Sequence, residues 1–280
     1  MGRYAVVLAL AVALAGCGGV VSSDDRATVT PAPVPTDGQG YPPGVTSDGV
    51  VAAEVVDAHV RSLATTSYTL TTVQEIRAED GTVLRRTNET RTVEPGPGAY
   101  QGRFYQERDT AGGGQERAAV KFWSNGTYVV TRYWNQEADG ERDVRQWSTE
   151  SDAPITDLTE RHHLKGDLAG VNVAPTRRTP DGGVLLAGSG FDNREYFVVP
   201  IVLSDPSDLR LQMHVRYDGV VVVAHVTYSA IYNGRPVEVR RETRVTDVGT
   251  ASVDRPAWTD EPSTVGDRTG QRLPLFVRDR

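Results

Sequence analysis

The best candidate for a metal site is the segment ERHHLKGD, at residues 160–167. Glu160, His162, His163 and Asp167 carry nitrogen and oxygen atoms of the kind that zinc accepts as ligands. Adjacent side chains point apart on a helix and on a strand, so the two histidines are not expected to face one ion. We therefore predict an exposed polar segment here and no metal site.

A second segment, EADGERD, offers oxygen ligands suited to calcium from Glu137, Asp139, Glu141 and Asp143. It lacks the order D-x-[DN]-x-[DN]-G, which wraps a calcium-binding loop around its ion. A hydrated acidic loop is the simpler interpretation of this segment.

Sequence motifs of enzymes are absent. The segment AGSGF at residues 187–191 departs from the G-x-S-x-G pattern that places a nucleophilic serine on a tight turn. The zinc-protease, P-loop and dinucleotide-binding patterns do not occur. His214 and His225 fall in predicted strands, where core or surface roles are expected. The sequence therefore predicts a protein that is not an enzyme and that needs no cofactor.

Cys17 is the only cysteine of the chain, and it follows a short apolar segment. Residues 1–16 combine one arginine, an apolar run and two small residues, which is the order of a signal peptide too short to span a bilayer. The residues LAG before Cys17 resemble a lipobox, in which the thiol is acylated and the chain is cut ahead of it. The alternative is an ordinary signal peptide followed by a free thiol, which is an oxidation liability on an exported protein. We therefore predict an anchor at Cys17, on the outer face of the cytoplasmic membrane.

The composition is acidic, with 30 Lys and Arg residues against 37 Asp and Glu residues and a net charge of −7. Only Lys121 and Lys165 are lysines. Nucleic acid is not an expected partner, because its binding requires cations that neutralise phosphates. An acidic chain with so little lysine resembles the proteins of salt-loving archaea.

Two sequons, at Asn88 and Asn125, are compatible with N-glycosylation of an exported protein. Asn125 is the better candidate, because Ser124-Asn125-Gly126 has the composition of an exposed turn.

The chain divides into four parts by composition. A signal peptide at residues 1–16 precedes a lipidated Cys and a Gly-, Ser- and Pro-rich tether at residues 17–47, which cannot bury a core. A β-rich globular domain is predicted for residues 48–262, and a polar tail for residues 263–280. Outside the signal peptide as well, no apolar run in the sequence is long enough to span a membrane.

The predicted domain begins with one amphipathic helix, within residues 47–68. Ala52, Val56, Val60 and Leu63 recur at helical spacing, and His59 lies at the border of this stripe. A second helix is predicted within residues 154–171.

Alternating apolar and polar residues predict strands from residue 67 onward. Three hairpins are expected, around residues 79–81, 124–126 and 180–183. A meander follows, with turns at residues 218–219 and 233–234. Its first strand has one apolar and one polar face, which is typical of an antiparallel sheet with one solvated side.

The middle strand of this meander is apolar on both faces, so each face needs a cover. Val222, Ala224, Val226 and Tyr228 alternate along one side and could line a ligand cavity. Trp123 and Trp134 could join them, because aromatic residues are sparse and cluster around the second hairpin. Ordinary core packing is the alternative for all six side chains.

Two segments carry a resemblance to a known family. YPPGVTSDGV, followed by DAHVRSLATTSYTL, resembles the start of the mature domain in haloarchaeal lipoproteins of unknown function, and RRETRVTDVGTASVDRPAWTDE is similar to its end. The resemblance implies a surface lipoprotein and supplies no catalytic residue. One helix followed by many antiparallel strands also resembles LolA/LppX-like lipoprotein carriers, which are half-open barrels that bind acyl chains.

We therefore predict an α+β fold, with a mainly antiparallel sheet, either open or curled into a half-open barrel, and an N-terminal amphipathic helix packed on it. The leading hypothesis is a non-catalytic, lipid-anchored protein that binds a hydrophobic or lipid ligand in a cavity of the sheet. The second is a structural or adhesive envelope protein without such a ligand. A carrier should leave several hundred Å³ lined by apolar side chains, whereas a scaffold should be packed as densely as any core.

Overall fold

A computed structural model describes residues 40–96, 98–110, 113–135, 142–148, 157–261 and 264–265. The predicted signal peptide, Cys17 and the tether up to residue 39 lie outside these residues. So do most of the predicted tail and the acidic residues Glu137, Asp139 and Glu141.

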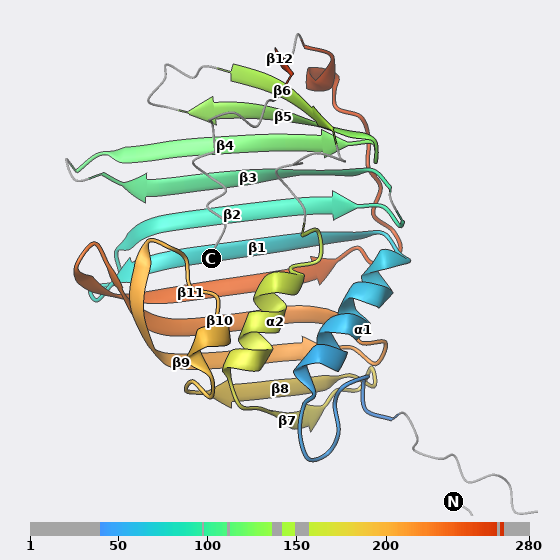
Figure 1. Ribbon diagram of the computed structural model, residues 1–280, viewed down its shortest axis with the longest axis vertical. Coiled ribbons are helices and arrows are strands. Elements are labelled where there is room, and N and C mark those ends of the chain that lie inside the picture. Colours follow the sequence, from blue (N-terminus) through green and yellow to red (C-terminus); the bar gives the residue numbers. More distant parts are fainter. Residues whose placement is uncertain are drawn as a thin grey trace, which may run out of the picture. The chain divides into compact units, whose positions relative to one another are not determined.

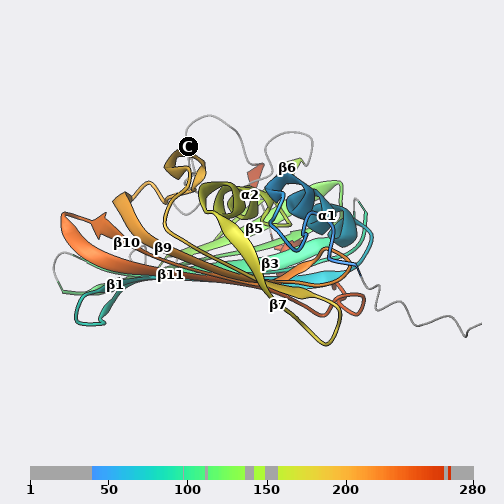
Figure 2. The same cartoon turned by 90° about the horizontal axis from the view of Figure 1, so that it is seen from below.

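The described residues form an open twelve-stranded sheet with two helices on one face (Figures 1 and 2). Every neighbouring pair of strands is antiparallel except β12 and β6, which confirms the prediction of a mainly antiparallel sheet. In chain order the elements are α1 (Ala52–Ala64), β1 (Tyr68–Ala78), β2 (Val83–Val93), β3 (Tyr100–Asp109), β4 (Gln115–Ser124), β5 (Tyr128–Asn135), β6 (Arg142–Ser148), α2 (Arg161–Gly170), β7 (Val173–Arg178), β8 (Val184–Ser189), η1 (Arg194–Tyr196), β9 (Leu203–Val215), β10 (Val221–Tyr232), β11 (Arg235–Thr246), η2 (Ala257–Asp260) and β12 (Thr264–Val265).

The strand order is β12-β6-β5-β4-β3-β2-β1-β11-β10-β9-β8-β7. Most neighbours in this order are neighbours in sequence, because short turns join them. The exception that organises the sheet is the pairing of β1 with β11, in which Thr69 lies opposite Thr246. This pair joins the N-terminal series of strands to the C-terminal meander, and β12 and β7 are left at opposite edges.

The tight turns follow the predicted glycine and asparagine positions. Gly81, Gly126 and Gly219 have positive φ angles of 87°, 89° and 89° in the turns β1–β2, β4–β5 and β9–β10. In the turn β10–β11, Asn233 and Gly234 both have positive φ, as a two-residue type I′ hairpin requires. Because these residue types adopt positive φ at low cost, the local sequence fixes which strands become antiparallel neighbours.

α1 packs on the sheet through Val55, Val56 and Leu63, each at most 2% exposed. Val56 and Leu63 belong to the predicted stripe, whereas Ala52 and Val60 are only half-buried. The buried face is therefore rotated from the predicted stripe, because α1 contacts α2 as well as the sheet.

The packed part of the chain begins before residue 48, where the sequence analysis places the boundary. Val45 is 5% exposed and belongs to the main core cluster. Its N–H donates to the carbonyl of Pro42 at 3.0 Å, and it forms a bridge with Val50. At the other end, β12 pairs with β6 beyond residue 262.

The two edge strands differ from the central ones. In β7, Pro175 lacks the N–H that a ladder needs, and the register shifts beside it. Arg177 and Arg178 follow it and are exposed. At the opposite edge β12 lies parallel to β6, with Thr264 opposite Arg145.

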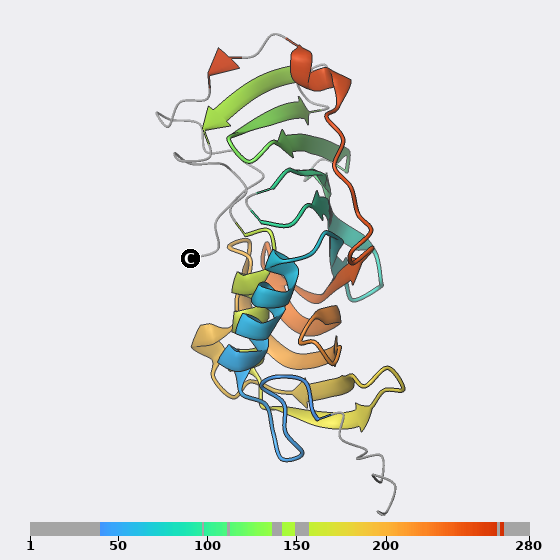
Figure 3. The ribbon, with the colours of Figure 1, turned by 90° about the vertical axis from the view of Figure 1, so that its right-hand side faces the viewer.

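Residues 247–261 run from the end of β11 along the sheet to η2, and we call them the C-terminal strap (Figure 3). The strap packs Val253 and Trp258 against Trp123, on the face of the sheet that the helices leave uncovered. Val253 N–H donates to Glu94 Oε1 at 3.2 Å, and Glu261 pairs with Arg132 at 3.2 Å.

Candidate functional site

The start of α2 is fixed by one carboxylate. Asp157 Oδ1 accepts hydrogen bonds from the N–H groups of Thr159, at 3.2 Å, and Arg161, at 3.0 Å. Its Oδ2 accepts from the N–H of His162 at 2.8 Å. Donors at the first turn of a helix have no partner within the helix, so Asp157 supplies partners that α2 would otherwise lack.

Three side chains then hold the peptide ahead of α2 against the rest of the domain. The side chains of Arg91, Tyr68 and His59 donate to the carbonyl oxygens of residues 157, 158 and 159 respectively. The last two bonds measure 3.1 and 3.0 Å. Consecutive carbonyls bound from β2, β1 and α1 leave this segment little freedom to move away from the sheet.

His59 was expected at the border of the helical stripe, but it is 2% exposed. Its Nδ1 accepts the N–H of Val221 at 3.1 Å, and its Nε2 faces the Thr159 carbonyl. The ring therefore carries its proton on Nε2. Burial, partly offset by the hydrogen bond to Thr159, lowers the pKa of His59 below its usual value. A neutral imidazole thus links α1, β10 and the segment before α2.

A buried ionic cluster lies under the start of α2. Arg91, which is 4% exposed, places Nη2 2.6 Å from Glu160 Oε1 and 2.9 Å from Glu89 Oε1. Glu160 Oε2 lies 2.7 Å from His163 Nδ1. Burial alone would raise the pKa of Glu160, but Arg91 and His163 outweigh it, so this pKa lies far below its usual range. Burial raises the pKa of Glu89, although Arg91 opposes the change.

A second buried pair joins the middle of α2 to the sheet. Arg241 on β11 places Nη2 2.5 and 2.6 Å from the two carboxylate oxygens of Asp167. The two side chains are 5% and 4% exposed. In so dry an environment each charge depends on the other, because a buried charge without a partner is strongly destabilising.

These arginines explain why the residues first considered for zinc do not gather around a metal ion. Glu160 and Asp167 each bind a guanidinium group, and His162 is exposed. Among the described residues, no group of three His, Cys, Asp or Glu side chains is arranged to hold a metal. The expected exposure of this segment is wrong for Glu160 and Asp167, because both carboxylates turn toward the sheet. In the acidic segment, Asp143 pairs with Arg145 at 2.5 Å.

The six residues proposed to line one cavity lie on two opposite faces of the sheet, so one cavity cannot contain them all. Ala224, Val226 and Tyr228 alternate on the face covered by the helices. Val222 lies at a register shift and packs beside a second buried cluster, in which Leu63 of α1 meets residues of several strands. Alternation within one hairpin shows which of its residues share a face. It does not show whether that face is the same as a given face of a distant hairpin.

Trp123 and Trp134 point to the uncovered face. Phe122, next to Trp123 in β4, packs with α1, so Trp123 must point the other way. Val130 of β5 lies opposite Trp123 and therefore on the same face. Trp134 shares this face, because it lies an even number of positions beyond Val130 in β5. Trp123 is 6% exposed because the C-terminal strap covers it.

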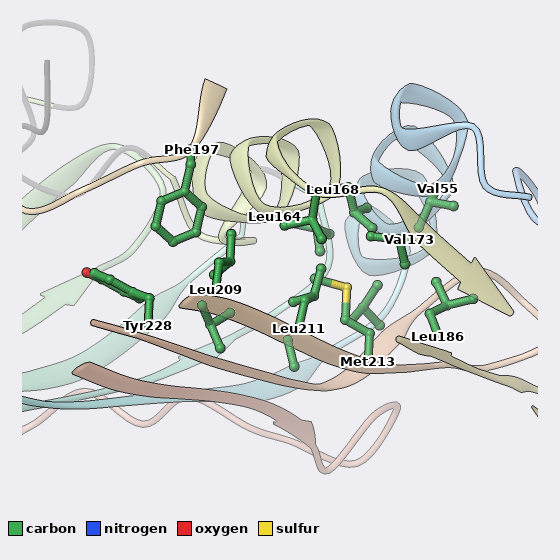
Figure 4. Packing of buried hydrophobic residues seen from close by; sticks show 14 of the residues in the cluster. Val55, Leu164, Leu168, Val173, Leu186, Phe197, Leu209, Leu211, Met213 and Tyr228 are labelled. Atoms are coloured by element: carbon green, nitrogen blue, oxygen red, sulfur yellow. The ribbon is translucent and has the colours of Figure 1, made fainter. Parts of the chain in front are cut away.

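The space between the helices and the sheet is filled by protein side chains (Figure 4). Phe197 stacks edge-on against Tyr228, with ring centroids 5.2 Å apart. Leu164 and Leu168 of α2 face the strand residues Leu209, Leu211 and Met213 in the same cluster. This arrangement is that of a packed core.

A hollow of about 360 Å³ lies elsewhere, between the strands β2–β4 and the strap. Its lining is mixed in chemistry and includes Thr90, Thr92, Gln101, Arg103, Lys121 and Trp258. Sequence reasoning missed this hollow, because its members come from three strands and a distant C-terminal segment. The one signal in the sequence was Lys121 itself, because it is one of only two lysines in the chain.

The two sequons lie in different environments. Asn125 is exposed in the β4–β5 turn, where its side-chain oxygen accepts from the N–H of Thr127 at 3.0 Å. Asn88 lies within β2, between β1 and β3, and its side-chain oxygen is buried.

No protein-family model and no curated protein matches the chain. Among solved structures, a beta-barrel-like protein of the domain of unknown function DUF1849 from Brucella abortus is 10% identical, with a TM-score of 0.25, and the match covers 66% of this chain and 99% of that one. A DUF1329 family protein from Desulfovibrio piger is 13% identical, with a TM-score of 0.23 and coverage of 75% and 97%. At such low TM-scores, neither likeness bears on the fold or the function.

The buried state of His59 predicts a pH dependence of stability. Its pKa is lower in the folded chain than the unfolded value of about 6.5, so the unfolded chain binds the proton first and stability is lost as pH falls below that value. We expect His59→Gln to reduce this slope by up to about 1.4 kcal/mol per pH unit, measured by denaturant unfolding across this range. The exposed His162→Gln should keep the wild-type slope. Equal slopes in wild type and His59→Gln would contradict the assignment.

The buried pair under α2 predicts a strongly non-additive mutation cycle. Arg241→Met should cost about 3–5 kcal/mol, because it leaves Asp167 charged and buried. The double variant Arg241→Met/Asp167→Leu should recover most of that loss in denaturant unfolding. The matched control is the neighbouring Arg240→Met, whose pair with Glu238 is exposed, so its loss should change the free energy of unfolding little. If Arg241→Met costs no more than Arg240→Met, the proposed role of the pair is wrong.

Proposed function

We propose that the chain is an exported lipoprotein, held at the outer face of the cytoplasmic membrane by an acylated Cys17. The order of charged, apolar and small residues before Cys17 supports this proposal. So does the resemblance to haloarchaeal surface lipoproteins. Among the described residues, no helix is long and apolar enough to cross a membrane. The Gly-, Ser- and Pro-rich residues after Cys17 would separate the domain from the lipid.

We further propose that the domain is a non-catalytic scaffold, which presents its uncovered sheet face to the outside. The single observation that carries this proposal is the filled space between the helices and the sheet. Buried carboxylates in this layer bind arginines of the same domain, so they are engaged in holding α2 in place. A core packed in this way favours the scaffold over the carrier.

A second candidate, the lipid carrier, is favoured by one specific observation. The apolar cluster under the helices is continuous from β8 to β11, and both helices cover it from the same side. An acyl or isoprenoid chain could replace α2 on this surface if the helix moved away. Such a movement would require the two buried ionic contacts of α2 to break together.

The anchor is tested by Cys17→Ser in the full-length chain. Without a thiol no acyl group can be attached, so we expect the variant in the culture medium and the wild type in the membrane fraction. Fractionation with immunodetection measures this directly. Retention of Cys17→Ser in the membrane fraction would contradict lipid anchoring at this residue.

The scaffold and carrier hypotheses are distinguished by measuring the lipid that copurifies with the Cys17→Ser protein. The protein is purified from the medium or from the membrane fraction, depending on which contains it. Organic-solvent extraction and mass spectrometry should find no lipid near one molecule per chain if the core is filled. A second variant, Leu168→Ala, opens space under α2 and serves as a control for adventitious binding. A defined lipid at near-equal stoichiometry in Cys17→Ser alone would overturn the scaffold proposal and establish the carrier.

A further inference from the structure

Two cations face each other on the uncovered side of the sheet. Arg103 on β3 lies directly opposite Lys121 on β4, and both side chains are exposed. Directly opposed residues in an antiparallel pair have Cβ atoms about 4.5–5.5 Å apart, and like charges in such positions destabilise the sheet. Neither residue has a hydrogen bond or ion pair to any described residue, so their repulsion is not compensated there.

The remaining cations of the same region are neutralised. On the same two strands, Arg117 pairs with Glu107 at 3.2 Å. Under the strap, Arg132 pairs with Glu261 at 3.2 Å. The chain has seven more carboxylates than cations, and yet among the described residues none forms an ion pair with Arg103 or Lys121; Glu261, the acidic residue near Lys121, pairs with Arg132, which lies opposite Lys121 on β5. The unpaired cations therefore mark a place where an anion from outside the chain would be stabilised.

The surroundings of the two cations have the form of a small binding site. Arg103 and Lys121 line the hollow of about 360 Å³, which is near the lower end of the range for ligand sites. Thr90, Thr92 and Gln101 add hydroxyl and amide groups to its floor, because they point outward from β2 and β3. Trp258 forms a wall and offers an apolar ring face.

The strap makes this wall rigid. Arg255 of the strap lies over the ring of Trp123, with its Cζ 5.5 Å from the ring centroid. The ion pair between Arg132 and Glu261 holds the strap just beyond η2. The position of Trp258 relative to the cations is therefore set before any ligand arrives, which reduces the ordering cost of binding.

We propose that this hollow binds a small acidic sugar, whose oxyanion lies between Arg103 and Lys121 and whose ring packs against Trp258. Charged groups recognise the carboxylate or sulfate, since charge-assisted hydrogen bonds are the stronger kind. The threonine and glutamine side chains match the ring hydroxyls. The site lies on the face that the proposed scaffold presents to the outside, but the inference does not depend on lipid anchoring.

The binding test uses glucuronate as the probe and saturation-transfer NMR of the full-length Cys17→Ser chain at about 0.1 M salt, where charges about 10 Å apart still interact. We expect saturation of the ring protons by the wild-type site, and at least tenfold weaker binding after Arg103→Gln/Lys121→Gln. Trp258→Ala should also weaken binding at least tenfold. Glucose, which has no oxyanion, should show no binding at the same concentration.

Arg117→Gln is the matched control, because it removes a cation from the same face of β4 outside the hollow. It should leave glucuronate binding within twofold of wild type. If Arg117→Gln weakens glucuronate binding as much as the double variant does, the effect comes from the overall charge of the protein, and the proposed site is wrong. Inorganic sulfate that binds as tightly as glucuronate would overturn recognition of the sugar ring. If the wild-type protein shows no binding of glucuronate, the proposal as a whole is wrong.

Thermal unfolding gives a second, independent readout. Because the free cations repel each other, Arg103→Gln/Lys121→Gln should melt at a higher temperature than wild type without ligand. Glucuronate should raise the melting temperature of wild type and leave that of the double variant unchanged. A double variant that is less stable than wild type, or that does not fold, would show that the two cations serve the fold and would contradict the proposal.

Discussion

Two arginines that point from the sheet toward α2 determine where that helix lies. Arg91 and Arg241 are almost fully buried, so their charges are tolerable only with carboxylates in contact. Glu160, which directly precedes α2, and Asp167, within α2, supply those carboxylates. Leu164 and Leu168 of α2 then face the apolar strands. A short helix of modest apolar content thus acquires one orientation on a broad sheet.

The two faces of the sheet use charge differently. On the covered face a few ion pairs are dry, and each fixes an element, whereas on the uncovered face many pairs are exposed and contribute little to stability. The exposed pairs still matter for recognition, because they neutralise Arg77, Arg86, Arg117 and Arg132 along β1–β5. Arg103 and Lys121 stand out against this background. The buried ion pairs that hold α2 and the unpaired cations of the hollow therefore lie on opposite faces of the sheet.

Local sequence predicted the hairpins well, because Asp-Gly and Asn-Gly turns and alternating residues are short-range signals. β3 escaped prediction, since its sequence, YQGRFYQERD, shows no clear alternation of apolar and polar residues. The pairing of β1 with β11 and the contact of Arg91 with Glu160, 69 residues away, are long-range and leave no periodic pattern. The same limit explains why the six cavity residues were wrongly assigned to one site, although their alternation within each strand was predicted correctly. To relate their faces requires the register across the four strands between β4 and β10 and the five between β5 and β10.

The open sheet ends at β7 and β12, and both ends resist extension by another strand. Pro175 removes a backbone donor from β7, and the exposed Arg177 and Arg178 would repel an identical strand laid alongside. At the other end, β12 already occupies the edge of β6 for two residues. An unclosed sheet of this width would otherwise template the growth of fibres. Its blunted borders allow many copies to lie close together as separate molecules.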